Sequence, residues 1–107
     1  MSQVIINNPN GKAQVCPKYE SIEFTLNTGE TDYDLASNQA TFKAVVDNPQ
    51  YVRISTTQNI SIKFNATTNH AISLNANTST EFDRQIFDNM YLSNSSGSGS
   101  TVRVYVK

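Results

Sequence analysis

The sequence contains few of the cysteine and histidine side chains that common catalytic sites use. The 107 residues include one cysteine, Cys16, and one histidine, His70. A cysteine becomes a strong nucleophile when a histidine or another cation stabilises its thiolate, but His70 ends the polar run 65–70, which is typical of a loop. We therefore interpret Cys16 as an ordinary, partly buried small residue. A single cysteine also excludes a disulfide within the chain.

The acidic residues come closest together in the run 29–34, where Glu30, Asp32 and Asp34 alternate with other residues. Alternating carboxylates can bind Ca²⁺, but a calcium site needs about six to eight oxygen ligands, and the spaced glycine and terminal glutamate of a calcium loop are missing. We interpret this run as a solvated loop. The nine acidic residues also show no pair suited to glycoside hydrolysis. The sequence thus predicts a protein that is not an enzyme, with no catalytic residues, no cofactor and no metal ion.

Tyrosines are the best candidates for contacts with a partner, because each combines an apolar ring with a polar hydroxyl. Tyr105 alternates with the valines around it, so it lies on the polar side of its strand, where it could anchor a contact or stack on a sugar ring. Tyr33, Tyr51 and Tyr91 are its candidate companions. The alternative interpretation is half-burial of these side chains at a sheet edge.

The composition favours a polar surface of short, uncharged side chains. Asn, Ser and Thr make up 36 of the 107 residues, and charged residues only 16%, against about 25% in typical proteins. Such a surface suits coverage by another protein, because short side chains lose little entropy when they are ordered. Exposed strand faces and turns explain the same composition equally well.

The charge and hydropathy patterns exclude two classes of partner. The net charge is -1 and the eight basic residues are scattered, so the electropositive stripe of a nucleic-acid-binding protein is missing. No stretch approaches the roughly 20 apolar residues of a membrane span, and the N-terminus does not resemble a signal peptide. We expect a chain that is made in the cytoplasm and stays soluble.

Alternation of apolar and polar residues with a period of two is the main structural signal. One face of each alternating segment is apolar and the other polar, which is typical of antiparallel sheets packed on a shared core. The last segment keeps the alternation throughout, so we expect it to be paired within a sheet. The alternation runs through residues 22–26, 51–56, 59–65, 72–74 and 101–107.

Turn residues separate the alternating segments. Residues 8–11, Asn-Pro-Asn-Gly, have the pattern of a type I turn and predict a hairpin between residues 4–6 and 13–15. Residues 93–100 have the composition of a flexible linker, but they lie between two strand patterns. We interpret them as a hairpin loop rather than as a domain boundary.

One segment, residues 37–46, does not follow the strand pattern. It predicts a short helix with Ser37 as the N-cap and with Phe42, Val45 and Val46 on the apolar side. A strand over residues 41–47 is the alternative, since the residue before a proline favours extended backbone. We favour the helix.

Together these patterns predict an all-β fold, an antiparallel β-sandwich that is jelly-roll-like, with about eight short strands and one short helix. A small closed barrel is the alternative. Residues 1–107 are expected to form a single domain, in which residues 1–15 are an N-terminal hairpin or arm.

Residues 51–107 resemble small β-sandwich virion proteins of tailed bacteriophages. The resemblance consists of I-x-I-K-F-N at residues 60–65, L-S-N-x-S-G at 92–97 and V-R-V-Y at 102–105. It implies a virion protein that decorates the head or forms part of the neck, the tail or a fibre base. It further implies a homo-oligomer, with a trimer favoured, whose partners are other virion proteins such as the major capsid protein or a neck or tail protein.

From this resemblance we expect a structural component of the virion, most of all a capsid decoration or cement protein. The apolar run Val4, Ile5 and Ile6 could attach it to a neighbour by adding a strand to that neighbour's sheet. The alternative is that this run completes the protein's own sandwich. The competing functional class is a lectin-like carbohydrate-binding module on a particle or cell surface, although the sequence contains no Trp, the residue that sugar platforms favour.

Overall fold

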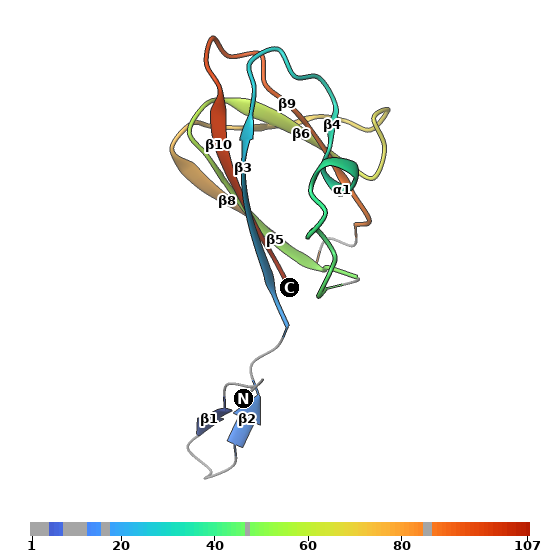
Figure 1. Cartoon of the computed structure of the whole chain (residues 1–107), viewed down its shortest axis with the longest axis vertical. Helices are drawn as coiled ribbons and strands as arrows, with labels where there is room; N and C mark the ends of the chain where they lie inside the picture. The colour runs from blue at the N-terminus through green and yellow to red at the C-terminus, as the bar shows by residue number, and fades with distance from the viewer. Residues whose placement is uncertain (1–4, 8–12, 16–17, 47, 85–86) are drawn as a thin grey trace.

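The computed structural model describes residues 5–7, 13–15, 18–46, 48–84 and 87–107, and eight strands within them form two four-stranded antiparallel sheets. The first sheet, ordered β3-β10-β5-β8, is built from β3 (Glu20–Leu26), β10 (Ser100–Val106), β5 (Tyr51–Thr56) and β8 (Thr78–Asp83). The second sheet, ordered β4-β9-β6-β7, is built from β4 (Tyr33–Asp34), β9 (Met90–Ser93), β6 (Ile60–Phe64) and β7 (Ile72–Leu74). The prediction of an all-β sandwich is confirmed (Figure 1).

The order of the strands is that of a jelly roll. When the eight strands of the sandwich are counted from β3 to β10, the first sheet has the order 1-8-3-6 and the second has the order 2-7-4-5. Each connection therefore crosses between the sheets, except the one from β6 to β7. Two sheets linked in this way form the double-sheet arrangement expected from the sequence.

The core lies between the two sheets and follows the alternation in the sequence. Val102, Val104 and Val106 on β10 are buried, while the residues between them face outward. One contiguous apolar cluster joins residues of both sheets, and full burial of each large side chain contributes about 1.5–3 kcal/mol. Ile72 is an exception, because it is 37% exposed on β7, which lies at a sheet edge and pairs on one side only.

The last strand, β10, is central to its sheet. It pairs with β3 on one side and with β5 on the other, which confirms that it is paired within a sheet. The loop before it was predicted to be a hairpin loop, and this is wrong: residues 94–99 connect β9 in one sheet to β10 in the other. The loop is not a hairpin loop because β10 pairs with β3 and β5 and not with β9. Asn94 in this loop is fully buried, and its Nδ2 donates to the carbonyls of Leu26 and Ser98 at 2.9 Å.

The predicted helix over residues 37–46 is also wrong in its bounds. The helix α1 spans Leu35–Asn38 and begins at the N-cap Asp34, whose Oδ1 accepts the N–H of Ser37 at 3.1 Å. Ser37 is thus inside the helix rather than its cap. Residues 39–46 form turns, so the described part of the alternative strand is not a strand either.

Three features explain why residues 39–46 do not continue the helix. The C-cap Gln39 has extended backbone, with φ -117° and ψ 98°. Lys43 has a φ of 62°, in the left-handed region, which is incompatible with a right-handed helix. The backbone N–H groups of residues 44, 45 and 46 donate to the carboxylate of Glu20 at the start of β3, at 2.8–3.1 Å. We call residues 34–46, which this carboxylate and neighbouring side chains attach to the sandwich, the clamped segment.

The N-terminal strands form a sheet of their own. β1 (Ile5–Asn7) pairs antiparallel with β2 (Ala13–Val15), with Ile5 opposite Val15. This is the pairing predicted for the hairpin, and the predicted turn at residues 8–11 lies outside the described residues. Figure 1 shows β1 and β2 apart from the sandwich, beyond the start of β3. The strands do not complete either four-stranded sheet.

Candidate functional site

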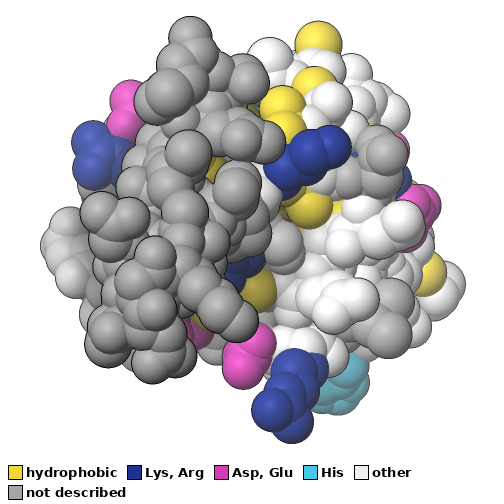
Figure 2. Space-filling model, turned by 90° about the horizontal axis from the view of Figure 1, so that it is seen from below, with side chains coloured by type: hydrophobic (Ala, Val, Ile, Leu, Met, Phe, Trp, Pro, Cys, Tyr) yellow, Lys and Arg dark blue, Asp and Glu magenta, His cyan; other side chains and the backbone are white. Residues whose placement is uncertain are grey.

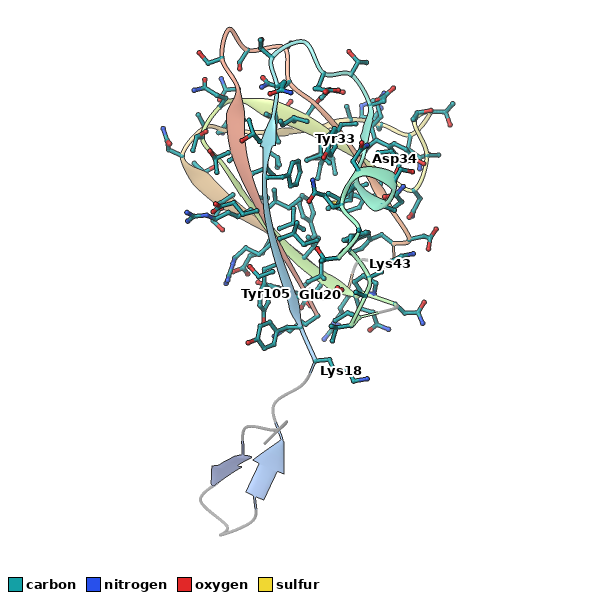
Figure 3. The ribbon with its side chains drawn as sticks, viewed as in Figure 1. Lys18, Glu20, Tyr33, Asp34, Lys43 and Tyr105 are labelled. Atoms are coloured by element: carbon teal, nitrogen blue, oxygen red, sulfur yellow. The ribbon has the colours of Figure 1, made fainter. Side chains whose placement is uncertain are left out.

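The outer face of the sheet β3-β10-β5-β8 gathers aromatic and basic side chains. Alternation on β10 places Tyr105 on this outer face, because its neighbours Val104 and Val106 point into the core. In the register of the sheet, Tyr105 lies opposite Arg53 on β5 and Ser21 on β3, and Figure 3 shows its ring at the outside of the sandwich. We call this surface the tyrosine face and define it by Tyr19, Tyr51, Arg53, Tyr105 and Lys107.

The rings of the tyrosine face contact one another in favourable geometries. Tyr19 is stacked on Tyr105 with ring centroids 5.7 Å apart, and Tyr51 meets Tyr105 edge to face at 6.1 Å. Arg53 Cζ and Lys107 Nζ each lie 5.0 Å from a ring centroid, over Tyr105 and Tyr51 respectively. Aromatic pairs and cation–π contacts of this kind each contribute about 0.5–1.5 kcal/mol. The cluster is therefore ordered by contacts within the chain.

The hydroxyl of Tyr51 is held in its neutral form. Burial raises the pKa of this phenol above its ordinary value, and the negative charge of nearby Glu81 raises it further, while Arg53 acts in the opposite direction. A tyrosine is already protonated at neutral pH, and the raised pKa extends the protonated form of Tyr51 further into the alkaline range. In this form the hydroxyl can both donate and accept a hydrogen bond.

Two shallow hollows extend from Tyr105 along the same face. The one beside Tyr105 has a volume of about 240 Å³ and the next about 440 Å³, and they share Ser55 and Arg103 in their linings. Serines, threonines and one asparagine supply most of the remaining lining. The larger hollow is lined by Ser55, Thr56, Thr57, Asn77, Thr78, Ser79, Thr101 and Arg103.

The charged residues that line the two hollows are arginines. Arg53 and Arg103 contribute to the lining, and no carboxylate does. Arg103 Nε donates to Glu23 on the neighbouring strand β3. Both members of that pair are more than half exposed, so their attraction is weakened by solvent. The lining of the hollows therefore combines hydroxyl groups with two guanidinium groups, and the nearest carboxylates in the register of the sheet are Glu23 opposite Arg103 and Glu81 opposite Arg53.

The structure brings only two of the four predicted tyrosines together. Tyr51 and Tyr105 belong to the tyrosine face. Tyr33 packs against the edge of the core, with its ring 5.2 Å from that of Phe24 and its hydroxyl accepting from Gln39 Nε2 at 2.8 Å. Tyr91 lies half-buried on β9 in the other sheet, opposite Lys63.

The predicted apolar run at the N-terminus is described only in part. Ile5 and Ile6 belong to β1, where the structure describes their backbone but not their side chains. Val4 and Cys16 lie outside the described residues. His70 is exposed.

The sequence interpretation missed Tyr19, Arg53 and Arg103. The alternation contained a signal for each of them, since Tyr19 has the same parity as the outward-facing residues of β3, and both arginines lie between buried residues. The alternation could not predict the strand order β3-β10-β5, which brings strands from three distant parts of the chain into contact.

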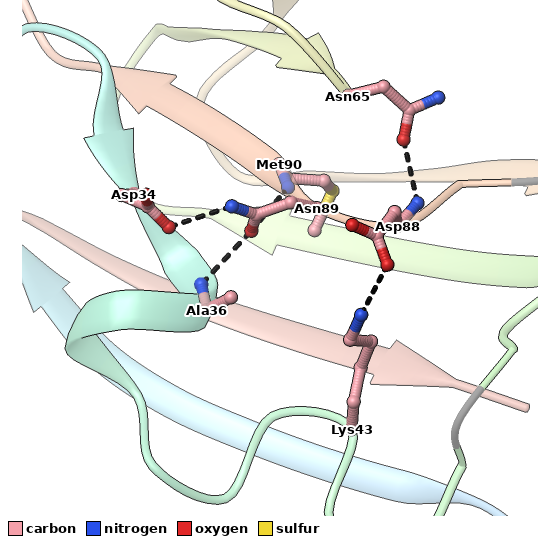
Figure 4. Close-up of polar contacts among 7 residues, drawn as sticks. All are labelled: Asp34, Ala36, Lys43, Asn65, Asp88, Asn89 and Met90. Atoms are coloured by element: carbon pink, nitrogen blue, oxygen red, sulfur yellow. Dashed lines mark hydrogen bonds and ion pairs between the residues drawn. The ribbon is translucent and has the colours of Figure 1, made fainter.

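Two carboxylates of the acidic run, those of Asp32 and Asp34, are bound to other residues of the chain. Asp32 pairs with Lys63 at 3.1 Å, and Asp34 accepts from Asn89 Nδ2 at 2.7 Å (Figure 4). The hydrogen bonds from Asn89 and from the Ser37 backbone lower the pKa of Asp34 below its ordinary value of 3.8. Among the residues that the structure describes, no group of three or more His, Cys, Asp or Glu side chains is placed to hold a metal ion.

Charges of both signs are mixed on the surface. Figure 2 shows basic and acidic side chains interspersed at the end of the molecule from which the N-terminal strands extend. In the described ranges, no helix is long and apolar enough to cross a membrane.

Comparisons with known proteins support the fold. No protein-family model matches the chain, and no curated protein matches it. Among solved structures, the chain is similar to a de novo designed double-stranded β-helix determined by solution NMR, with a TM-score of 0.55 and 21% sequence identity over 82% of this chain and 99% of the designed one. At this identity the similarity shows the fold alone.

Proposed function

We propose that the protein is a non-enzymatic structural subunit of a tailed-phage virion, a decoration or cement protein that attaches to the particle surface through its N-terminal strands. The resemblance of residues 51–107 to small virion proteins supports the class of protein. Jelly rolls occur in viral capsid domains as well as in lectins, so the fold is compatible with this class by analogy only.

One observation carries the proposal: β1 and β2 form a separate two-stranded sheet, while the sandwich has its eight strands without them. A two-stranded hairpin is at best marginally stable alone in water. It gains stability when it adds to the sheet edge of a neighbouring molecule, because backbone hydrogen bonds and apolar side chains are then covered. The N-terminal strands are therefore the part of this chain best suited to attachment.

The mechanism is adhesive. A subunit that binds assembled shell proteins better than separated ones opposes their separation in proportion to its binding free energy. Its own copies are expected to form a closed symmetric oligomer, with a trimer favoured. Its partners are other virion proteins, namely the major capsid protein or a neck or tail protein.

The proposal is tested by removing residues 1–15 and measuring binding to purified capsids that lack the protein. We expect the truncated chain to keep the β-sheet signal in far-UV circular dichroism and to lose capsid binding. Unchanged binding by the truncated chain would refute attachment through the arm. Native mass spectrometry of the full chain tests the assembly, since a closed ring supports the proposal and a strict monomer argues against it.

A further inference from the structure

We infer that the tyrosine face and the hollows beside it bind an acidic oligosaccharide, meaning one whose pyranose rings carry carboxylate groups. This inference goes beyond the structural role proposed above, because it assigns a ligand to one face of the sandwich and does not involve the N-terminal strands.

The first reason is an exposed aromatic platform. Tyr19 is 57% exposed, and Tyr105 is stacked against it at 5.7 Å. A ring already fixed by a second ring loses little conformational entropy when a ligand packs on it. The C–H groups on one side of a pyranose ring form an apolar surface, which suits a flat aromatic ring.

The second reason is the chemistry of the hollows. They continue from Tyr105 and are lined mostly by hydroxyl side chains, among them Ser21, Ser55 and Thr101. A hydroxyl both donates and accepts hydrogen bonds, so it can be either the donor or the acceptor in a hydrogen bond with a sugar hydroxyl. The larger hollow, at about 440 Å³, falls within the range of about 300–1,000 Å³ found for small-molecule sites.

The third reason is charge, and it specifies an acidic sugar. Arg53 and Arg103 line the hollows. The residues opposite them in the sheet, Glu81 on β8 and Glu23 on β3, carry carboxylates that lie beside the hollows and not in their lining. A guanidinium binds a carboxylate through two parallel hydrogen bonds. Because Arg103 binds Glu23 through Nε, its terminal amino groups are the donors that a sugar carboxylate would meet.

A protein partner fits this face less well. The exposed large apolar side chains of the described residues are Tyr19, Val45 and Ile72, which lie before β3, in the clamped segment and on β7. They do not form one patch across the tyrosine face. The centre of a protein–protein interface is more apolar and depleted of charge, whereas this face presents hydroxyls and guanidinium groups.

The experiment begins with the full-length protein on a glycan array that carries uronate and sialate glycans beside neutral glycans of the same length. The strongest acidic glycan is then titrated by isothermal calorimetry at low and high salt. We expect binding to acidic glycans, weakened by salt because the attraction between charges is screened. Its neutral counterpart should bind at least about tenfold more weakly, since it lacks the carboxylate–arginine bonds.

Variants locate the site. We expect Tyr105→Ala and Arg103→Gln each to weaken binding by about tenfold, the scale of a strong single contact, and Tyr105→Phe to keep most of it because the ring remains. The matched controls are Tyr91→Ala and Lys63→Gln, which remove a tyrosine and a cation that lie opposite each other on the other sheet. Both should bind as the unchanged protein does.

The outcomes are decisive in either direction. Acidic-glycan binding that Arg103→Gln loses and Lys63→Gln keeps supports the inference, and circular dichroism establishes that each variant is folded. The absence of acidic-glycan binding, a preference for neutral glycans, or equal losses in the face variants and the controls would each overturn it. Since the arm remains intact in every variant, capsid binding is measured independently of glycan binding.

Discussion

The clamped segment and the tyrosine face are both rich in polar side chains, but their polar groups have different partners. In the clamped segment, side chains bind the backbone: Glu20 accepts three N–H groups, and Asn89 Oδ1 accepts the N–H of Ala36 at 3.0 Å (Figure 4). On the tyrosine face, side chains contact one another and line open hollows.

This difference predicts which substitutions lower the stability of the fold and which weaken the binding of a ligand. A backbone group that loses its side-chain partner must find water or remain unpaired, and that costs free energy of folding. A side chain on an exposed strand face can change without leaving a backbone group unsatisfied. We therefore expect substitutions in the clamped segment to affect folding and substitutions on the tyrosine face to affect ligands.

The largest expected effect is that of Glu20→Ala. The carboxylate is buried and accepts the N–H groups of residues 44, 45 and 46. Hydrogen bonds to charged groups contribute about 1.5–3 kcal/mol each, and water replaces part of that at partly exposed positions. We expect the free energy of unfolding to fall by about 3 kcal/mol, measured by urea denaturation. A loss below about 1 kcal/mol would contradict the importance of the clamp.

Asn89→Ala tests the other side of the same segment. The side chain is buried, donates to Asp34 and accepts the N–H groups of Ala36 and Met90. We expect a loss of about 2 kcal/mol, because at least one buried N–H group is left without a partner. Thermal unfolding of Asn89→Ala measures this loss, with Asn75→Ala, a substitution at an exposed position, as the matched control. Equal melting temperatures of the two variants would argue against the role of Asn89.

Tyr105→Ala is the corresponding test on the tyrosine face. It removes the ring contacts with Tyr19 and Tyr51 and the cation–π contact with Arg53. The side chain is half-buried, so we expect a loss of about 1 kcal/mol, smaller than in either clamp variant. If urea denaturation shows a loss as large as that of Glu20→Ala, the distinction between the two regions fails.

Acid titration measures how much one carboxylate of the clamped segment, that of Asp34, contributes to stability. Since the pKa of Asp34 is lower in the folded chain than its ordinary value of 3.8, its carboxylate stabilises the fold fully above that value, and the contribution is lost as the pH falls through the folded-state pKa. We expect a small effect, about 0.5 kcal/mol, because the group is partly exposed. The stability difference between the unchanged protein and Asp34→Asn should therefore shrink below about pH 4. A difference that stays constant down to pH 2 would contradict this.

The sequence predicted the sandwich because burial follows the alternation residue by residue. Ile62 is buried, its neighbours Ser61 and Lys63 are half-exposed, and the same rule orients β10. The bounds of α1 and the loop before β10 were not predictable in this way. The helix α1 begins at Asp34, whose side chain also accepts from Asn89 far away in the chain. The loop before β10 contains Asn94, which binds the backbone of Leu26, also distant in sequence.

The candidate site was predictable only as a set of residue types. The alternation placed Tyr105 outward, but it treated Tyr33 and Tyr91 as its equivalents. Strand order decided the outcome, since β4 and β9 belong to the other sheet. Tyr33 was further drawn to the edge of the core by stacking on Phe24. The alternation shows on which face of a strand a residue lies, whereas only the sheet topology shows which strands lie beside it.

The smallest expected effect on stability is that of Arg103→Gln. Arg103 and Glu23 form an ion pair in which the side chains are 69% and 56% exposed, and exposed pairs contribute about 0–1 kcal/mol. We expect a change in the free energy of unfolding of less than about 0.5 kcal/mol, measured by urea denaturation, with Glu23→Gln as the matched control. A loss above about 1.5 kcal/mol would show that the pair is structural. Because the expected change is so small, a loss of glycan binding in Arg103→Gln can be assigned to the missing guanidinium rather than to partial unfolding.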